Sequence, residues 1–182
     1  MLVQRSLFVL GILGVLAIPI AADAQLVRSG SPELSFKAFG TIGFSMTGKT
    51  SELNVSDSAQ SISVIVPVGT LSTDNDLRDK HMKERLEVAK YPSAELSVAK
   101  SALNLPAAGQ NSSGDAEGTL KLHGQNRPVK FHYDAKRNGN AYHVDGKMRV
   151  NFNQFGIEVP SYLGITVKPD VEVAVRFDAV DK

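Results

Sequence analysis

The sequence predicts an all-β fold: an antiparallel sheet of about eight strands that closes into a barrel or stacks into a sandwich, with one short helix between strands. Apolar and polar residues alternate with a period of two over most of the chain after residue 25, which is typical of strands with one dry and one wet face. Turn-forming residues separate these segments. So many strands in one domain must close or stack to hide their edges.

The alternation is clearest from Pro128 onward. Its expected dry face carries an apolar residue at every second position: Val129, Phe131, Tyr133, Tyr142, Val144, Met148, Val150, Phe152, Val171, Val173, Val175 and Phe177. Earlier segments repeat the pattern less cleanly, around residues 33–38, 41–46, 62–68, 96–98 and 120–122. Gly48-Lys49 is predicted to be a turn, and Asn111–Asp115 a polar loop.

The Asn138-Gly139 pair predicts a hairpin and its register. A two-residue type I′ turn at these residues pairs Arg137 with Asn140. Gly146 then faces Phe131, and its missing side chain leaves space for a ring or a ligand. The expected pairs are Tyr133–Val144, Phe131–Gly146 and Val129–Met148 on the dry face, and Asp134–His143 and His132–Asp145 on the wet face.

Residues 76–87 lack the alternation and predict the short helix. They are rich in good helix formers, and Asp76 with Asp79 three residues on is a variant of the capping box. Arg78 and Asp79 are adjacent, so they do not face each other on a helix. We therefore interpret Arg78, Asp79 and His81 as structural anchors of the helix rather than as catalytic groups.

Residues 1–24 have the pattern of a cleaved signal peptide. Arg5 precedes the uncharged stretch Leu7–Ile20, and Ala22-Asp23-Ala24 has the small-residue spacing of a cleavage site. The apolar stretch is shorter than the roughly 20 residues that a membrane-spanning helix needs. We expect cleavage before Gln25, a single domain over residues 25–182, and a periplasmic or secreted location.

The composition excludes several classes of function. The net charge is +1, which argues against a nucleic-acid partner. The chain has no cysteine, so it offers no thiol nucleophile and no thiolate metal site. It also lacks the common nucleophile, zinc and phosphate-loop motifs, and we expect no cofactor. The histidines and aspartates of the wet face, His132, Asp134, His143 and Asp145, are interpreted as a solvated surface rather than as a metal site.

Four short segments follow one another in a characteristic order. They are Leu71–Met82 with Arg78-Asp79-Lys80-His81, Lys90–Leu96 with Tyr91-Pro92, Gly118–Gly124 followed by Arg127-Pro128-Val129, and Asn153–Ile157 with Phe155-Gly156-Ile157. This series resembles the YceI-like family, secreted bacterial proteins described as polyisoprenoid-binding or lipid-binding. The family's usual histidine-containing first segment has no match between Gln25 and Thr50, so head-group contacts made there in other members do not transfer.

The resemblance implies a lipocalin-like antiparallel barrel in the periplasm, whose interior holds a long isoprenoid or another lipid chain. An isoprenoid quinone fits this description, and transient membrane contact is compatible with it. A mixture of Phe, Tyr and Met around a glycine is also typical of an apolar ligand pocket. The residues predicted to line the barrel are Val129, Phe131, Tyr133, Val144, Gly146, Met148 and Phe152.

Three functions compete on this sequence. The leading prediction is a lipid-binding protein without enzymatic activity that carries or sequesters an apolar chain, because each buried CH₂ contributes about 0.8 kcal/mol. The second is a barrel or sandwich with a filled core that acts as a structural or partner-binding protein. The third is a hydrolase or isomerase, for which only Asp79, His81 and the outer His/Asp pairs are available.

Overall fold

The computed structural model describes residues 25–159, 161–162 and 165–182. The predicted signal peptide, residues 1–24, lies outside them. The described residues form ten strands, one α-helix and three 3₁₀ helices. In chain order these are β1 (Leu26–Gly40), β2 (Ser45–Thr50), β3 (Asn54–Asp57), β4 (Ser61–Pro67), η1 (Val68–Thr70), α1 (Asp76–Arg85), β5 (Ser93–Ala99), η2 (Lys100–Ala102), β6 (Asn111–Leu122), β7 (Gln125–Asn138), β8 (Ala141–Asn151), η3 (Phe152–Phe155), β9 (Ser161–Tyr162) and β10 (Ile165–Asp181).

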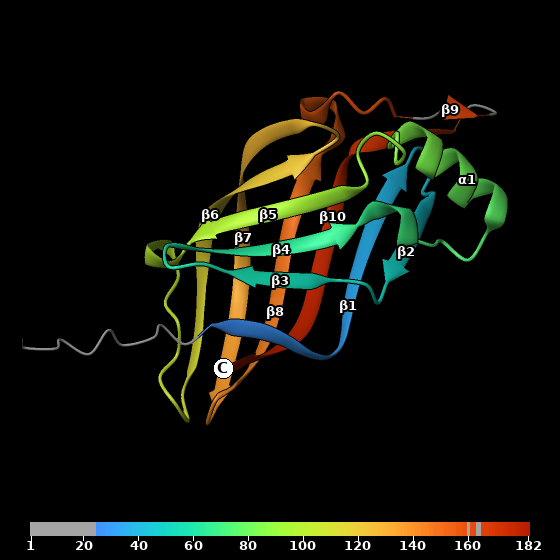
Figure 1. Cartoon of the computed structure of the whole chain (residues 1–182). Helices are drawn as coiled ribbons and strands as arrows, with labels where there is room; N and C mark the ends of the chain where they lie inside the picture. The colour runs from blue at the N-terminus through green and yellow to red at the C-terminus, as the bar shows by residue number, and fades with distance from the viewer. Residues whose placement is uncertain (1–24, 160, 163–164) are drawn as a thin grey trace, which may run out of the picture.

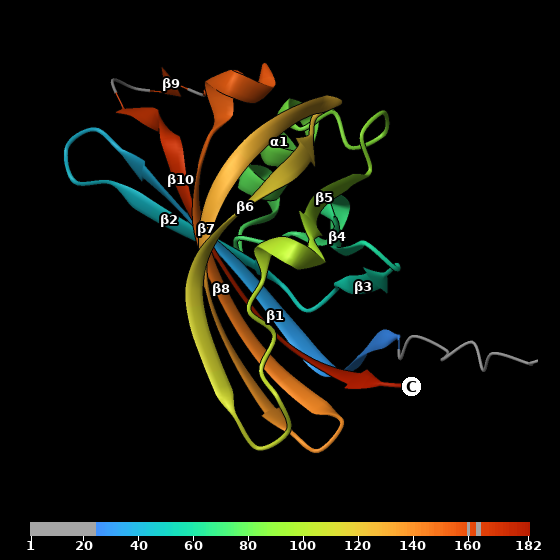
Figure 2. The same cartoon turned by 90° about the vertical axis from the view of Figure 1, so that its left-hand side faces the viewer.

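One antiparallel sheet makes up most of the molecule. Nine strands follow the order β2-β1-β10-β8-β7-β6-β5-β4-β3, and β9 pairs with β10 beside this path. The sheet curls into a half-barrel, so that β3, β4 and β5 lie across from β1, β8 and β10 (Figures 1 and 2). This confirms the predicted all-β antiparallel fold and selects the barrel over the sandwich, with nine strands in the main sheet where about eight were expected.

The two arms of the sheet meet where β3 approaches the start of β1. The Asp57 side chain, at the end of β3, is 2% exposed, and its Oδ1 lies 2.7 Å from Lys100 Nζ. Its Oδ2 accepts a hydrogen bond from the Leu26 backbone amide at 2.9 Å, and Gln25 Nε2 donates to the Asp57 carbonyl. A buried carboxylate needs such partners to offset its desolvation. Side-chain contacts of one aspartate therefore join β1 to β3.

The single helix of the described residues lies at one end of the half-barrel (Figure 1). Its N-cap is Asn75, whose side chain accepts a hydrogen bond from the Arg78 backbone amide at 2.9 Å. Asp76, which the sequence suggested as the cap, is the first helical residue, where its charge favours the helix dipole. The helix ends at Arg85, two residues before the predicted boundary.

The hairpin between β7 and β8 has a different register from the predicted one. Asn138 pairs with Ala141, so the loop is Gly139-Asn140. Gly139 has a φ of +62°, whereas neither Asn138 nor Asn140 has a positive φ. A positive φ at the first central residue alone is the type II′ pattern, in which the glycine stands one position earlier than in the expected type I′ turn.

This change shifts the hairpin by two residues and exchanges the partners. Phe131 lies opposite Met148, and Gly146 lies opposite Tyr133, so the predicted Phe131–Gly146 pair is wrong. A shift of two leaves every side chain on its predicted face, because side chains alternate with a period of two. The wet-face pairs are Asp134–Asp145 and His132–Lys147 in place of those expected.

Two further segments differ from the predictions. Residues 111–115 belong to β6 and pair with β7, although their composition suggested a loop. Their half-buried positions are occupied by the small residues Ser112 and Gly114, and the large Tyr133 side chain faces Gly114. Gly48-Lys49 lies within β2, and the hairpin between β1 and β2 turns instead at Ile42, which is 90% exposed.

The buried side chains form two clusters. The larger one gathers around Phe155 and Val171, which are 0% and 1% exposed, and the smaller one gathers around Phe177 and Ala179. Members of both clusters also line the interior of the half-barrel. In the described ranges, no helix is long and apolar enough to cross a membrane.

Candidate functional site

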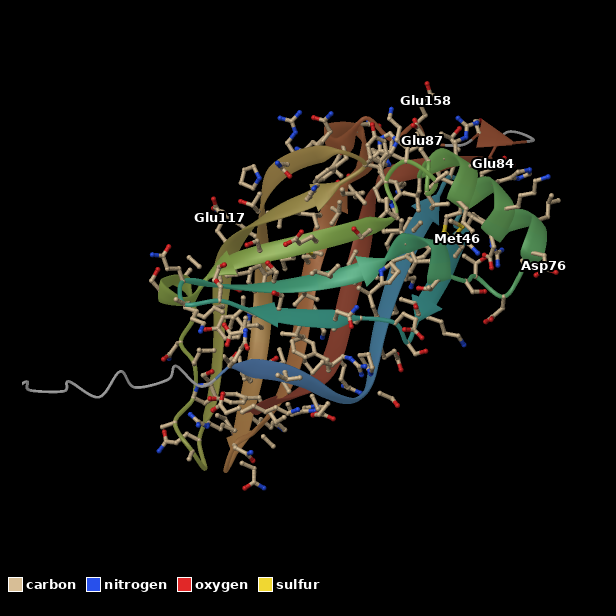
Figure 3. The ribbon with its side chains drawn as sticks, viewed as in Figure 1. Met46, Asp76, Glu84, Glu87, Glu117 and Glu158 are labelled. Carbon is tan, nitrogen blue, oxygen red and sulfur yellow. The ribbon has the colours of Figure 1, made fainter. Side chains whose placement is uncertain are left out.

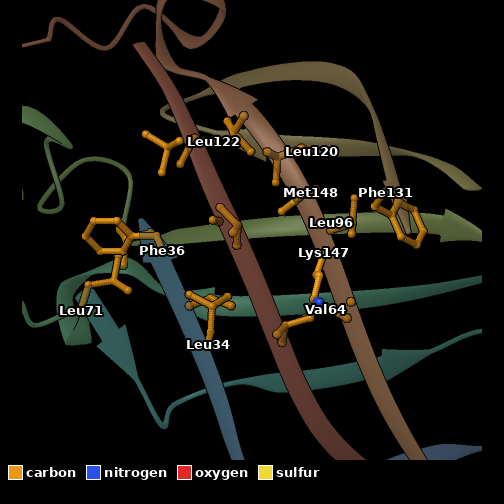
Figure 4. Close-up of a pocket in the computed structure, with 18 of the residues that line it drawn as sticks. Leu34, Phe36, Val64, Leu71, Leu96, Leu120, Leu122, Phe131, Lys147 and Met148 are labelled. Atoms are coloured by element: carbon orange, nitrogen blue, oxygen red, sulfur yellow. The ribbon is translucent and has the colours of Figure 1, made fainter. Parts of the chain in front are cut away.

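The half-barrel encloses a cavity of about 850 Å³. Side chains from both arms of the sheet line it, among them Leu34 and Phe36 of β1, Val64 of β4, Leu96 of β5 and Met148 of β8 (Figure 4). This volume lies within the range of about 300–1,000 Å³ that small-molecule sites span, and such sites are predominantly apolar. The interior of this barrel is therefore hollow and apolar.

Six of the seven predicted lining residues border the cavity. They come from β7, β8 and the start of η3, and are Phe131, Tyr133, Val144, Gly146, Met148 and Phe152. Their inward direction follows from the period-two alternation, which the two-residue register shift leaves unchanged. Contact of these residues with a ligand stays a prediction.

Val129 does not border the cavity, which corrects its predicted place. It is 8% exposed and belongs to the larger buried cluster with Leu120, Leu122 and Phe155. Val129 precedes Phe131 on the same face of β7, at the end of the strand against which η3 packs. Packing of η3 there fills the space that is open farther along the strand.

The lining becomes polar at the end beside α1. Side chains from α1, its N-cap, the segment between η3 and β9, and β9 itself contribute the polar groups: Asn75, Arg78, His81, Glu84, Arg85, Glu158 and Ser161. His81, Glu84 and Arg85 are exposed, as is Leu77 on the same helix, at 64%. The exposed side chains of α1 therefore mark the mouth of the cavity.

Arg78 and Asp79 anchor α1 through Thr73. Arg78 donates from Nε to Thr73 Oγ1 (2.7 Å) and from Nη2 to the Thr73 carbonyl (2.6 Å). The buried Asp79 carboxylate accepts hydrogen bonds from the Thr73 amide and hydroxyl and from Ser72 Oγ (2.7 Å). Burial alone would raise the pKa of Asp79, but these hydrogen bonds outweigh it and the pKa lies below its usual value. Both residues are thus engaged in holding the helix, whereas His81 lies at the cavity mouth.

The outer face carries the remaining histidine–aspartate pairs. His132 Nδ1 lies 2.8 Å from Asp115 Oδ1, and His143 Nδ1 lies 2.6 Å from Asp178 Oδ1. These pairs sit on different strand pairs of the sheet, and within residues 25–159, 161–162 and 165–182 no group of three or more His, Asp or Glu could hold a metal ion. The outer face therefore contributes ion pairs to the sheet.

Sequence comparison now assigns the family. The family model of the YceI-like domain matches residues 26–179, which is nearly the whole described part of the chain. The chain belongs to the YceI-like family. No curated protein is a detectable sequence relative.

Solved structures show the same YceI-like fold at low sequence identity. A polyisoprenoid binding domain from Saccharophagus degradans, implicated in plant cell wall breakdown, matches with a TM-score of 0.74 and 17% identity, over 88% of this chain and 100% of that one. BcnA of Burkholderia cenocepacia matches with a TM-score of 0.62 and 15% identity, over 81% and 96% of the two chains. The YceI protein of Campylobacter jejuni matches with a TM-score of 0.53 and 14% identity, over 74% and 84%.

Several YceI-like sequence motifs meet in space near the mouth. His123 and Gly124 form the turn between β6 and β7, with φ of +50° and +72°. The His123 ring packs edge-on against Tyr91, with centroids 4.8 Å apart, and its Nδ1 donates to the Phe155 carbonyl at 3.0 Å. A Cβ at Gly124 would lie 2.6 Å from Tyr91, so a glycine is required there. These motif residues therefore hold the turn between β6 and β7 against Tyr91 and η3.

Sequence reasoning placed the lining on β7 and β8 alone, because the alternation is cleanest there. The structure adds an equal contribution from β1, β4 and β5, whose weaker alternation already placed Phe36, Val64 and Leu96 on an apolar face. Of the polar residues at the mouth, the sequence singled out Arg78 and His81, as anchors of the helix, and did not predict the others. Glu158 lies 73 residues from its ion-pair partner Arg85, a separation that no local pattern reveals.

Proposed function

We propose that this protein binds a long apolar lipid chain, such as an isoprenoid, inside the half-barrel. The observation that carries the proposal is the apolar cavity of about 850 Å³, most of whose polar side chains lie at one end. The structural neighbour from Saccharophagus degradans, described as a polyisoprenoid binding domain, supports the same chemistry.

Apolar burial supplies enough free energy for such binding. Each CH₂ removed from water contributes about 0.8 kcal/mol, so ten buried carbons contribute about 8 kcal/mol before costs. The entropy lost on immobilising the ligand offsets several kcal/mol of this favourable free energy. A chain that fills the cavity therefore binds without a specific polar contact, whereas a short chain binds weakly.

The biological role that we propose is carriage or sequestration outside the cytoplasm. The signal-peptide pattern of residues 1–24 supports export to the periplasm or the exterior, with cleavage before Gln25. A water-soluble barrel there shields an isoprenoid or isoprenoid quinone from water and releases it at a membrane. The proposal describes a binding protein and not an enzyme, in keeping with the structural engagement of Arg78 and Asp79.

The alternative role, a structural barrel with a filled core, is disfavoured by the cavity. A packed interior leaves few voids larger than a water molecule. About 850 Å³ of space far exceeds such voids.

Native mass spectrometry of protein expressed with residues 1–24 and purified from the periplasm tests the proposal. We expect a protein mass that begins at Gln25 and a co-purifying lipid that is released in organic solvent. The delipidated protein should also take up N-phenyl-1-naphthylamine, an uncharged apolar dye, with a rise in fluorescence. Failure of the delipidated protein to bind the dye or any prenyl chain would refute lipid binding, and retention of residues 1–24 would refute cleavage.

A further inference from the structure

The polar end of the cavity fixes how a ligand lies in it. The cavity is also bordered by Tyr133 of β7 and Tyr142 of β8. The hairpin that joins these two strands lies at the end of the molecule away from α1 (Figure 1). Tyr133 Oη accepts from the Asn104 amide at 2.7 Å, and Tyr142 Oη donates to Asp181 at 3.3 Å. Burial and the Asp181 carboxylate raise the pKa of Tyr142, which keeps this donor protonated. The Tyr142 hydroxyl hydrogen is thus engaged, and a ligand with one polar group places it at the α1 end, where most polar side chains of the lining gather.

Both arginines at that end already have partners. Arg78 donates from Nε and Nη2 to Thr73, and Arg85 Nη1 lies 2.9 Å from Glu158 Oε2. Figure 3 shows Glu158 and Glu84 at this same end of the molecule. The other cation on the lining, Lys147, comes from the middle of β8 and is exposed. The charge of Arg85 is thus balanced by Glu158, and the Arg78 guanidinium is held against Thr73.

Two polar side chains of the mouth, those of Glu84 and His81, are available to a ligand. Among the described residues, the side chains of Glu84 and His81 have no hydrogen-bond or ion-pair partner, and both border the cavity. They are three residues apart on α1, which places their Cβ atoms about 5–6 Å from each other on one face. A carboxylate only accepts hydrogen bonds, whereas an imidazole can donate one. Together they match a hydroxyl, which donates to Glu84 and accepts from His81.

We propose that the ligand is a lipid alcohol with an uncharged hydroxyl headgroup at α1, and that Glu84 excludes anionic headgroups such as a diphosphate or a carboxylate. The proposal rests on the proposed function, because it names the headgroup of the same bound chain. The Glu84 carboxylate has no ion-pair partner among the described residues, and like charges brought together at a binding site weaken association strongly. The charge of this single side chain thereby sets the ligand class.

Displacement of N-phenyl-1-naphthylamine tests this with two ligands of equal chain length, farnesol and farnesyl diphosphate. The parent should bind farnesol at least about tenfold more tightly than the diphosphate. Because the diphosphate is also the more water-soluble ligand, the informative quantity is the change in this ratio in Glu84→Lys. The matched control is Glu117→Lys, the same charge change at an exposed position on the outer face of β6, away from the mouth (Figure 3).

We expect Glu84→Lys to lower the farnesol preference by about tenfold or more and Glu117→Lys to leave it unchanged, with equal thermal midpoints. An equal ratio in the two variants would overturn the role of Glu84, and so would a parent that binds the diphosphate as tightly as farnesol. These failures differ from failure of the proposed function, in which the parent binds neither the dye nor either prenyl ligand.

Discussion

Tyr133 of β7 lies directly opposite Gly146 of β8, and on its other side it pairs with Gly114 of β6. A Cβ at Gly114 would lie 3.5 Å from the Tyr133 ring and hydroxyl. The aromatic side chain thus occupies the space that Gly114 leaves open on β6. With its hydroxyl held by the Asn104 amide, Tyr133 is a fixed part of the cavity wall.

Replacing Gly146 with phenylalanine should block ligand uptake while the fold is retained. A Cβ at this position meets only Val175 Cγ1 at 3.0 Å and a backbone oxygen at 3.9 Å, so Val175 must shift slightly and the ring then enters the cavity. Overpacking a full core costs roughly 1–3 kcal/mol, and we expect the lower part of this range because the interior is hollow. The readouts are the thermal midpoint and uptake of N-phenyl-1-naphthylamine.

The matched control for this change is Gly69→Phe. Gly69 is exposed in η1, and a Cβ there meets nothing within 4 Å, so the added ring points into open space. Uptake should be normal in this variant. A midpoint that drops by more than about 10 °C in Gly146→Phe, where about 2–4 °C per kcal/mol is usual for a domain of this size, would show that the interior is packed.

The observed register of β7 and β8 can be trapped by engineered disulfides. His132 lies opposite Lys147 on the outer face, whereas the type I′ turn would have placed it opposite Asp145. Residues directly opposite each other have Cα atoms within the reach of a disulfide, and diagonal ones do not. Because the chain has no cysteine, His132→Cys with Lys147→Cys should oxidise to one intramolecular bridge. His132→Cys with Asp145→Cys should stay reduced, and the opposite result would restore the predicted register.

In β7 and β8, the sequence predicts the sheet face on which each side chain lies better than it predicts which residues pair across the two strands. The period of two placed Phe131, Tyr133, Val144 and Met148 toward the interior, and the cavity contains all four in its wall. Partner identity depends on the φ of one or two turn residues, and an Asn-Gly-Asn sequence offers the glycine to either turn type. The ends of helices and strands likewise depend on the backbone angles of one or two residues, as Asn75 rather than Asp76 at the helix N-cap shows.

The lack of partners for Glu84 and His81 at the mouth could not be predicted from the sequence, for a different reason. Glu84 and His81 become a pair of interest only because Arg85 is paired with Glu158 and Arg78 is hydrogen-bonded to Thr73, and these are long-range or loop contacts. The composition of α1, mixed in charge over its whole length, gives no indication of which charges stay uncommitted. The family motif predicts the helix, but it does not indicate which of its charged side chains lack a partner.

Removing the buried carboxylate of Asp57 should open the contact between β1 and β3. In Asp57→Ala, the Lys100 ammonium, whose side chain is 25% exposed, loses its partner, and the Leu26 amide loses its acceptor. Breaking a buried pair in this way costs about 3–5 kcal/mol. Hydrogen exchange of the amides of residues 26–29 should accelerate more than that of β7.

Glu172→Ala is the control for Asp57→Ala, because Glu172 forms an exposed ion pair with Arg149 at 2.8 Å. Such surface pairs contribute about 0–1 kcal/mol. Equal stability losses in the two variants would mean that Asp57 does not hold the two strands together.

Asp79→Asn should lower the free energy of unfolding at neutral pH and weaken the dependence of this free energy on pH in the acid range. The pKa of Asp79 is lower in the folded state than its ordinary value of about 4. The Asp79 carboxylate therefore contributes its full stabilisation at neutral pH, and this stabilisation is lost as the pH falls below about 4 and through the lower folded-state pKa. We expect a loss of about 1–3 kcal/mol at pH 7, because the Thr73 and Ser72 donors lose a charged acceptor. Urea unfolding at pH 7 and pH 3 measures both effects, with the exposed Asp76→Asn as the control in the same helix. The variant and the parent should differ less at pH 3 than at pH 7, and a constant difference would show that the Asp79 charge does not stabilise the helix anchor.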